Sequence, residues 1–173
     1  MKIAKLLCGS VLAALAIVAC KKQQNETVSN QLNQADSTFI SLAGPCNSSQ
    51  VQTANLAISK SADSAVLSYA QQILAEYSKA QTDLKVMGTI VGFTVSDTID
   101  TVHATIISQL ETLTGGTFDT AYIRTQLADY PSIVTFYNDE IKNGLQINVK
   151  AYANSILQNI QLDVQKADST AGH

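Results

Sequence analysis

Positive charge is scarce in this chain of 173 residues, and so is charge of either sign. The eleven lysines and arginines are outnumbered by fourteen aspartates and glutamates, so the formal net charge is −3. Charged residues make up 14% of the sequence, where about 25% is usual for a globular protein. Because affinity for nucleic acid depends on basic side chains that neutralise phosphates, a chain without a basic stripe is not expected to bind nucleic acid.

Residues that commonly bind catalytic metal ions are also few. Histidine occurs only at positions 103 and 173. The glutamates are Glu26, Glu76, Glu111 and Glu140. A ferritin-like di-metal centre takes a glutamate from each of two helices and a Glu-x-x-His pair from each of two others, and no glutamate here has a histidine three places later. We therefore predict no metal ligand, no cofactor and no catalytic residue, and interpret the protein as a non-enzyme.

One histidine lies close to a carboxylate in the sequence. Asp100 and His103 are three residues apart, so they share a face if this segment is helical. Two ligands rarely hold a transition metal in a water-filled site, and no nucleophile-elbow motif accompanies the histidine. We interpret the two residues as a solvent-facing pair near the start of a helix.

Cysteine is too rare to form a disulfide framework. Of the three cysteines, Cys8 and Cys20 lie within the first 20 residues, which are interpreted below as an export signal and the residue that follows it. Cys46 is therefore left without an intramolecular partner. A lone thiol in an exported protein either reacts, pairs between chains or serves as a small side chain. Residues 44–47 read as a turn, and this favours the small side chain.

No apolar run in the sequence is long enough to span a membrane. Lys2 and Lys5 precede an apolar stretch from Leu6 to Val18, which has 13 residues, whereas a transmembrane helix needs about 20. A basic start, an apolar centre and a small residue before the cut are typical of an export signal. We therefore predict a signal peptide over residues 1–19.

The end of this signal indicates a lipid anchor. Ile17-Val18-Ala19-Cys20 resembles the lipobox of bacterial lipoproteins, in which the cysteine carries the lipid. We predict Cys20 as the lipid attachment site, with acyl chains such as palmitate; the alternative is a secreted protein that is cut nearby and not lipidated. Several acyl chains anchor a protein firmly, because each buried methylene contributes about 0.8 kcal/mol.

The residues around and after Cys20 indicate where the protein is displayed. Residues 20–35 are polar and have no apolar periodicity, so we predict a lipidated cysteine followed by a flexible linker. Lys21 stands where enteric lipoproteins retained in the inner membrane have aspartate. We therefore expect a lipid-anchored cell-envelope protein of the outer membrane, and its periplasmic or surface orientation stays open.

Apolar residues recur at spacings of three and four over most of the remaining chain, which is typical of amphipathic helices. We predict helices over residues 36–60, 64–87, 99–113, 117–143 and 147–166. Gly44-Pro45 is expected to bend or interrupt the first helix, and Pro131 to kink the fourth. The Gly115-Gly116 pair is expected to end the third. Residues 88–98 are expected to form an extended crossover loop with at most a short strand.

These helices predict an all-α bundle, because each apolar stripe must be buried against others. We expect the bundle domain over residues 36–168, beginning at an N-cap, Asp36, and a disordered tail over residues 169–173. The tyrosines lie on the helical stripes, where aromatic rings are expected to fill the core. They are Tyr69, Tyr77, Tyr122, Tyr130, Tyr137 and Tyr152.

Several short motifs resemble one bacterial family, domain of unknown function 4142, whose members are described as predicted outer membrane proteins. The resemblance covers about residues 36–168, and its most specific piece is the spacing Gly-xx-Phe-Asp-xx-Tyr. The matching residues are Ala35-Asp36 with Phe39, Leu56-Ala57, Val66 with Tyr69-Ala70, and Leu110-xx-Leu113-x-Gly115-xx-Phe118-Asp119-xx-Tyr122. The resemblance implies a ferritin-like up-and-down four-helix bundle with an additional or broken helix, and it implies no particular activity.

The same resemblance identifies positions where this chain departs from the family. A glutamate usually occupies the place of Gln50, and histidines usually occupy the places of Tyr77, Tyr130 and Asp163. Such polar residues are the obvious candidates for metal or proton chemistry in family members. Their replacement argues against that chemistry in this protein.

Two classes of function stay open. We favour a non-catalytic binding or structural module, whose partner is an envelope protein or a small apolar ligand held between helices. The alternative is a ferritin-like metal-binding or redox protein with atypical ligands. That alternative rests on analogy between folds, which does not by itself indicate function.

Overall fold

Five helices make up the described part of the chain. The computed structural model describes residues 31–171, and the predicted signal peptide, Cys20 and His173 lie outside them. The helices are α1 (Gln34–Lys60), α2 (Ser64–Val91), α3 (Thr101–Glu111), α4 (Gly115–Asn143) and α5 (Ile147–Ala171). Residues 31–171 contain no strand, and none of their helices is long and apolar enough to cross a membrane.

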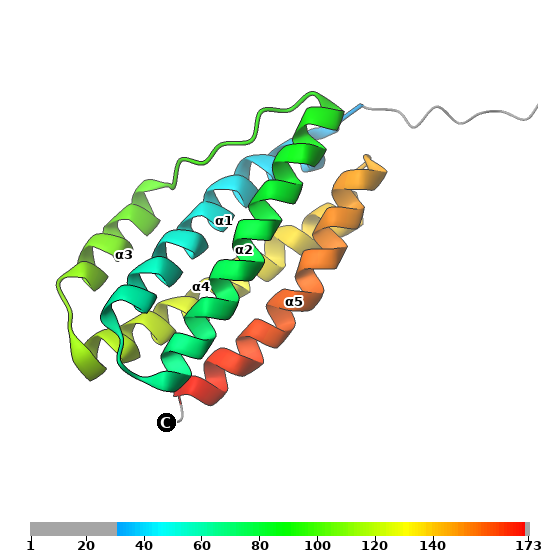
Figure 1. Cartoon of the computed structure of the whole chain (residues 1–173). Helices are drawn as coiled ribbons and strands as arrows, with labels where there is room; N and C mark the ends of the chain where they lie inside the picture. Colours follow the sequence, from blue (N-terminus) through cyan, green and yellow to red (C-terminus); the bar gives the residue numbers. More distant parts are fainter. Residues whose placement is uncertain (1–30, 172–173) are drawn as a thin grey trace, which may run out of the picture.

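Four of the helices form a bundle, and α3 lies along its side (Figure 1). α1 packs chiefly on α2 and α4 chiefly on α5, while contacts of α1 with α4 and of α2 with α5 close the bundle. The crossover from α2 runs back along the bundle to α3, so α2 and α4 point in the same direction instead of alternating (Figure 1). One long crossover of this kind is typical of ferritin-like bundles. The predicted all-α, ferritin-like bundle is confirmed, and α3 is its additional helix.

α1 begins earlier than predicted, because Asn33 and not Asp36 is its N-cap. The Asn33 side chain accepts the Asp36 N–H at 2.9 Å, and the Asp36 carboxylate accepts the Asn33 N–H at 2.7 Å, which makes a capping box. Asp36 is fully buried. Its carboxylate also accepts the N–H groups of Leu145 and Gln146 at 3.1 and 3.0 Å, so it joins the start of α1 to the loop before α5.

α1 continues through Gly44 and Pro45, so the predicted interruption is wrong. Packing overrides the local preference here, since residues on both sides of the proline are buried against the other helices. Gly44 allows a close approach: a Cβ at this position would lie 2.6 Å from the backbone oxygen of Ser96 in the crossover. The predicted turn around Cys46 is wrong for the same reason, because Cys46 lies inside α1 and is buried.

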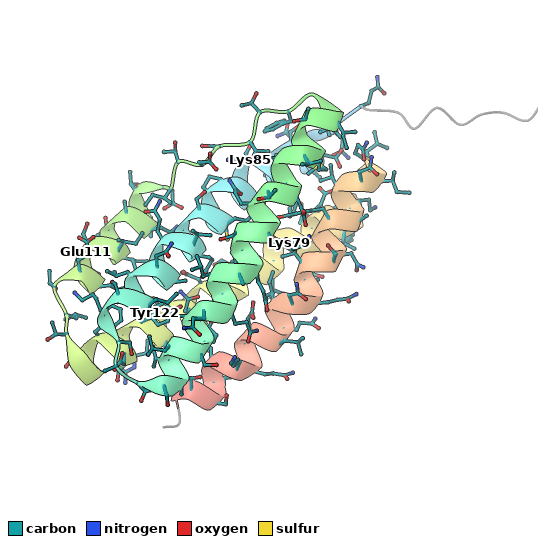
Figure 2. The ribbon with its side chains drawn as sticks, in the orientation of Figure 1. Lys79, Lys85, Glu111 and Tyr122 are labelled. Atoms are coloured by element: carbon teal, nitrogen blue, oxygen red, sulfur yellow. The ribbon has the colours of Figure 1, made fainter. Side chains whose placement is uncertain are left out.

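The crossover starts later than predicted, because α2 extends to Val91 and is capped by Gly92 at φ 75°. Two side chains of α2 hold the crossover through Asp97. Gln81 donates to one oxygen of this carboxylate at 2.7 Å, and Lys85 donates to the other at 2.6 Å. Lys85 is labelled in Figure 2 below the crossover. No strand forms in this part of the described chain.

The Gly115-Gly116 pair begins α4 and does not end α3, so that prediction is also wrong. α3 already ends at Glu111. Gly115 has φ 56°, a left-handed conformation that glycine adopts without strain and that turns the chain into α4. Lys60 at the end of α1 donates to the backbone oxygen of Glu111, so the ends of α1 and α3 are joined. Figure 2 labels Glu111 on α3.

The last two helices differ from prediction mainly at one end. α4 contains Pro131 and ends at Asn143, as predicted. α5 extends to Ala171, so residues 169–171 are helical and the predicted tail is wrong for them. The physical reason is burial of Ala167, which packs the last turns of α5 onto the bundle. Residues 172–173 lie outside the described residues.

Tyrosines fill the core, as predicted. All six are buried, and none is more than 8% exposed. Figure 2 shows Tyr122 between the bundle helices. Its ring stacks on Phe118 with a centroid distance of 6.2 Å, and Phe39 meets Tyr137 edge to face at 4.9 Å. Such aromatic pairs contribute about 0.5–1.5 kcal/mol beyond the burial of their area.

Candidate functional site

The four positions that depart from the family pattern lie on four different bundle helices. Gln50 is on α1, Tyr77 on α2, Tyr130 on α4 and Asp163 on α5, and each is at most 2% exposed. The polar interior of the bundle is therefore built from residues far apart in the sequence. What these side chains do depends on their hydrogen bonds and on their protonation.

Two phenols bond to each other across this interior. The hydroxyls of Tyr69 and Tyr130 lie 2.6 Å apart and link α2 to α4. Burial raises the pKa of both phenols far above the ordinary value of 10.0. Both tyrosines therefore stay neutral, and one hydroxyl donates to the other. A neutral phenol pair holds two helices together by a hydrogen bond and is a poor ligand for a metal ion.

The remaining tyrosines are also neutral. Burial raises the pKa of Tyr77, Tyr122 and Tyr137 far above the ordinary range. Burial raises the pKa of Tyr152 to about 12, although Asn47 donates a hydrogen bond to its oxygen at 3.0 Å. The interior therefore contains several hydroxyl groups and no phenolate.

A pair of carboxyl groups lies at the seam between α2 and α5. Asp163 is fully buried, accepts a hydrogen bond from Gln72 Nε2 at 3.1 Å, and shares a side-chain hydrogen bond with the Glu76 carboxyl. Burial raises the pKa of Asp163, and the neighbouring Glu76 carboxyl raises it further. Sequence reasoning singled out Asp163 only as a departure from the family. The signal for its burial was its place on the apolar stripe of α5, three residues after Ile160.

A groove opens on the opposite side of the bundle, between α1, the start of α3 and the middle of α4. We call it the lateral groove; its volume is about 850 Å³. Its lining is largely apolar, with a small acidic group and a histidine at one end. The lining residues that matter below are Leu42, Cys46, Asp100, Val102, His103, Asp129 and Phe136. Leu42 and Val102 are exposed at its rim.

His103 connects two helices at this groove. Its Nδ1 lies 2.5 Å from the Asp100 carboxylate, and its Nε2 lies 3.5 Å from the Asp129 carboxylate on α4. Hydrogen bonds to Asp129 and Asp100 raise the pKa of His103 from 6.5 to about 9, so both ring nitrogens carry protons at neutral pH. The predicted pairing with Asp100 near a helix start is confirmed, but the histidine is half-buried. Sequence reasoning missed Asp129, which is distant in the chain.

The structure tests the prediction for Cys46 but not the prediction for Cys20. Cys20 lies outside the described residues, so its predicted lipidation stays a prediction. Cys46 lines the groove, but burial raises its pKa to about 12 and keeps the thiol protonated. This agrees with a structural role for Cys46, although within a helix and not in a turn.

The most specific family motif has a structural role. Gly115 starts α4, and the Phe118 and Tyr122 rings of the same helix stack in the core. Lys60 lies 5.6 Å from the centre of the Phe118 ring, a distance suited to a cation–π contact. The Gly-xx-Phe-Asp-xx-Tyr spacing therefore reports how α4 begins and packs.

The arrangement of these helices places the chain among the all-helical bundle proteins. The fold is similar to the crystal structure of a DUF305 fragment from Deinococcus radiodurans, with a TM-score of 0.73 and 14% sequence identity; the match covers 82% of this chain and 97% of that chain. At this identity the likeness shows the fold alone.

The sequence matches the family model described as domain of unknown function DUF4142 over residues 21–170. The chain belongs to this family, so the predicted resemblance is confirmed and extends to residue 21. No curated protein matches the chain.

Proposed function

We propose that this DUF4142 protein is a lipid-anchored protein of the cell envelope, in the outer membrane, that acts as a non-catalytic binding or structural module. Cys20 carries the proposal, because it follows a small residue at the end of an apolar export signal. The described chain enters the bundle at the start of α1, at the end where α2 and α4 finish (Figure 1). A lipid on Cys20 would hold this end of the bundle toward the membrane.

The lateral groove supports the binding part of the proposal. Asp100 and Asp129 carry two negative charges, and His103 compensates one of them. Apolar side chains such as Leu42 and Phe136 line the rest of the groove. The complementary partner is a segment of an envelope protein that combines apolar side chains with a basic residue.

Substitution of Cys20 tests the anchor. We expect Cys20→Ser to lose incorporation of radiolabelled palmitate and to leave the outer-membrane fraction of a density gradient. Cys46→Ala is the matched cysteine control and should keep both properties. Palmitate labelling that survives in Cys20→Ser, or that is missing in the unmodified protein, contradicts the anchor. Protease treatment of intact cells then decides whether the bundle faces the periplasm or the medium.

Site-specific crosslinking in cells tests the groove. A photoreactive residue at Val102, which is 65% exposed at the rim, should crosslink to a partner segment that is apolar and basic. The same residue at Val86, 58% exposed on α2, is the matched control and should not form this adduct. An acidic partner segment, an adduct with lipid, or equal crosslinking from both positions contradicts the proposed partner.

A ferritin-like metal-binding or redox protein with atypical ligands is the second candidate. It is supported by interior oxygen atoms of Gln50, Tyr122 and Gln126 that lack hydrogen-bond partners in the described part of the chain. Among residues 31–171, no group of three or more histidine, cysteine, aspartate or glutamate side chains is placed to hold a metal ion. Elemental analysis before and after iron loading decides the matter: stoichiometric iron or manganese favours this candidate, and neither metal in either sample removes its basis.

A further inference from the structure

Two large apolar side chains are exposed where α4 passes into α5. Leu145 is 60% exposed and Ile147, the first residue of α5, is 65% exposed, whereas Gln146 between them is 1% exposed. The backbone here is held in place, because the Asp36 carboxylate accepts the N–H groups of Leu145 and Gln146 at 3.1 and 3.0 Å. A fixed backbone therefore presents both apolar side chains to the outside of the bundle.

This loop lies beside the point where the described chain enters the bundle. Asn33, the N-cap of α1, donates through its side chain to the Asn143 carbonyl oxygen at 2.9 Å. Figure 1 shows the starts of α1 and α5 and the ends of α2 and α4 at the same end of the bundle. Ile90, in the last turn of α2, is 52% exposed at this end. Exposed apolar side chains therefore gather where the N-terminal segment arrives.

Positive charge accompanies them. Lys142 is exposed in the last turn of α4, and Lys150 on α5 donates to a backbone oxygen of the loop at 3.1 Å. Of the acids next to the loop, Asp36 and Glu140 are buried and Asp139 is exposed. Two lysines therefore stand against one exposed acid, although the formal net charge of the whole chain is −3. Lysines beside apolar side chains suit a bilayer surface with anionic headgroups.

The length of chain before the bundle limits how far this end can lie from a lipid anchor. Residues 21–30 separate Cys20 from the described chain, and a segment of this length spans at most about 40 Å. A tether this short keeps the end of the bundle at a high effective concentration near the membrane. Contacts that are weak on their own are then sufficient to orient the bundle.

We propose that Leu145, Ile147 and Lys142 form a docking face that seats this end of the bundle on the bilayer, an inference that rests on the proposed lipid anchor. The two apolar side chains enter the headgroup region, and Lys142 meets anionic headgroups there. A second copy of this chain is a poorer occupant, because it would bring the lysines of both copies together and like charges repel. The bundle then stands end-on, which leaves the lateral groove accessible from the side.

Quenching of introduced tryptophans by brominated lipids tests the docking face, because the sequence contains no tryptophan of its own. The lipid-modified protein is purified in detergent and reconstituted into vesicles of phosphatidylethanolamine and phosphatidylglycerol. Acyl-chain bromine should quench tryptophan at least threefold more strongly in Leu145→Trp and Ile147→Trp than in Leu162→Trp. Leu162 is the matched control, because it is 60% exposed on α5 and lies about 22 Å from Ile147 along that helix.

The outcomes separate the docking face from the anchor. Protein that floats with the vesicles but shows no quenching at positions 145 and 147, or equal quenching at 145 and 162, overturns the docking face and leaves the anchor standing. Chemical crosslinking of two copies through this end, without quenching, also overturns it. Protein that does not float with the vesicles refutes the anchor, and the docking face with it.

Substitutions around one reporter show which side chains hold the face on the bilayer. In the Ile147→Trp protein, adding Leu145→Ser or Lys142→Gln should reduce quenching at least twofold. Adding Leu162→Ser to the same protein is the matched control and should leave quenching unchanged. All three positions are exposed, so the variants keep the buried core. Unchanged quenching in both test variants, or an equal reduction in the control, overturns the assignment.

Discussion

The hydrogen bond between Tyr69 and Tyr130 shows how single residues determine this interior. Each hydroxyl is buried, and each is a partner for the other at 2.6 Å. Removing one of them leaves the second hydroxyl buried without a partner, whereas removing both leaves two apolar rings of nearly the same shape. The energetic consequence of a substitution therefore depends on the residue across the bundle.

Tyr69→Phe should lower the free energy of unfolding by about 1–2 kcal/mol, because it leaves the buried Tyr130 hydroxyl without a hydrogen-bond partner. Tyr130→Phe should have a similar effect. The double variant should lose clearly less than the sum of the two, and urea unfolding of all four proteins measures this as a double-mutant cycle. Additive losses would mean that the two hydroxyls do not depend on each other.

His103 should make stability depend on pH. Its pKa rises from 6.5 to about 9 in the folded protein, so it contributes fully below pH 6.5 and loses this contribution as the pH rises through about 9. His103→Gln cannot carry the charge. Between pH 6.5 and about 9.5 the unmodified protein should lose of order 1 kcal/mol relative to His103→Gln, a modest value because the two ion pairs are partly exposed to solvent. Urea unfolding across this range measures the difference, and parallel curves would contradict it.

At the scale of elements, the position of α1 depends on its contact with the crossover. Gly44 lies against the backbone of Ser96, and Gln81 holds the same segment from α2 by donating to the Ser96 carbonyl oxygen at 3.2 Å. The crossover is therefore packed between side chains and backbone of two helices. This packing explains why an irregular segment keeps a defined path along the bundle.

Gly44→Ala should destabilise the protein by about 1–3 kcal/mol, because its Cβ would lie 2.6 Å from the Ser96 backbone oxygen and the crossover must shift. Gly116→Ala is the matched control, since a Cβ there meets nothing within 4 Å and alanine favours the helix. It should be neutral or slightly stabilising. Thermal unfolding of both variants tests the prediction, and a Gly44→Ala protein as stable as the control would contradict it.

At the scale of the whole molecule, one cluster of carboxyl groups joins the two halves of the bundle. Asp36 ties α1 to the loop before α5, and Glu140 of α4 lies beside it and is 1% exposed. Burial and a hydrogen bond with Asp36 raise the pKa of Glu140 from 4.5 to about 8. An acid with a raised pKa stabilises the folded state below its unfolded value, and this stabilisation is lost as the pH rises through about 8.

Glu140→Gln should remove the loss of stability at rising pH, because the glutamine amide donates a hydrogen bond to Asp36 at every pH. Relative to the unmodified protein, the variant should gain up to about 4 kcal/mol between pH 5 and pH 9, measured by urea unfolding, because each unit of pKa difference corresponds to about 1.4 kcal/mol. Asp139→Asn is the control, since Asp139 is its exposed neighbour and bonds to Asn143 at 2.6 Å. A constant difference between Glu140→Gln and the unmodified protein at all pH values would show that Glu140 does not titrate in this range.

Sequence reasoning succeeded where a signal repeats along the chain and failed where one residue competes with packing. The apolar stripes located all five helices and the tyrosine core. Pro45 was expected to interrupt a helix, yet buried neighbours on both sides keep α1 continuous. Gly115 was read as a stop, because sequence does not show whether a left-handed glycine ends one helix or begins the next.

The sequence by itself determined the helical class and the family, and it supplies the prediction of a lipid anchor at Cys20, because periodicity and local motifs need only neighbouring residues. The tertiary structure alone decided which polar groups meet. Asp129 reaches His103, Glu140 reaches Asp36, and Glu76 reaches Asp163 only after the helices pack, since each pair joins different helices. The groove and the raised pKa values both follow from that packing.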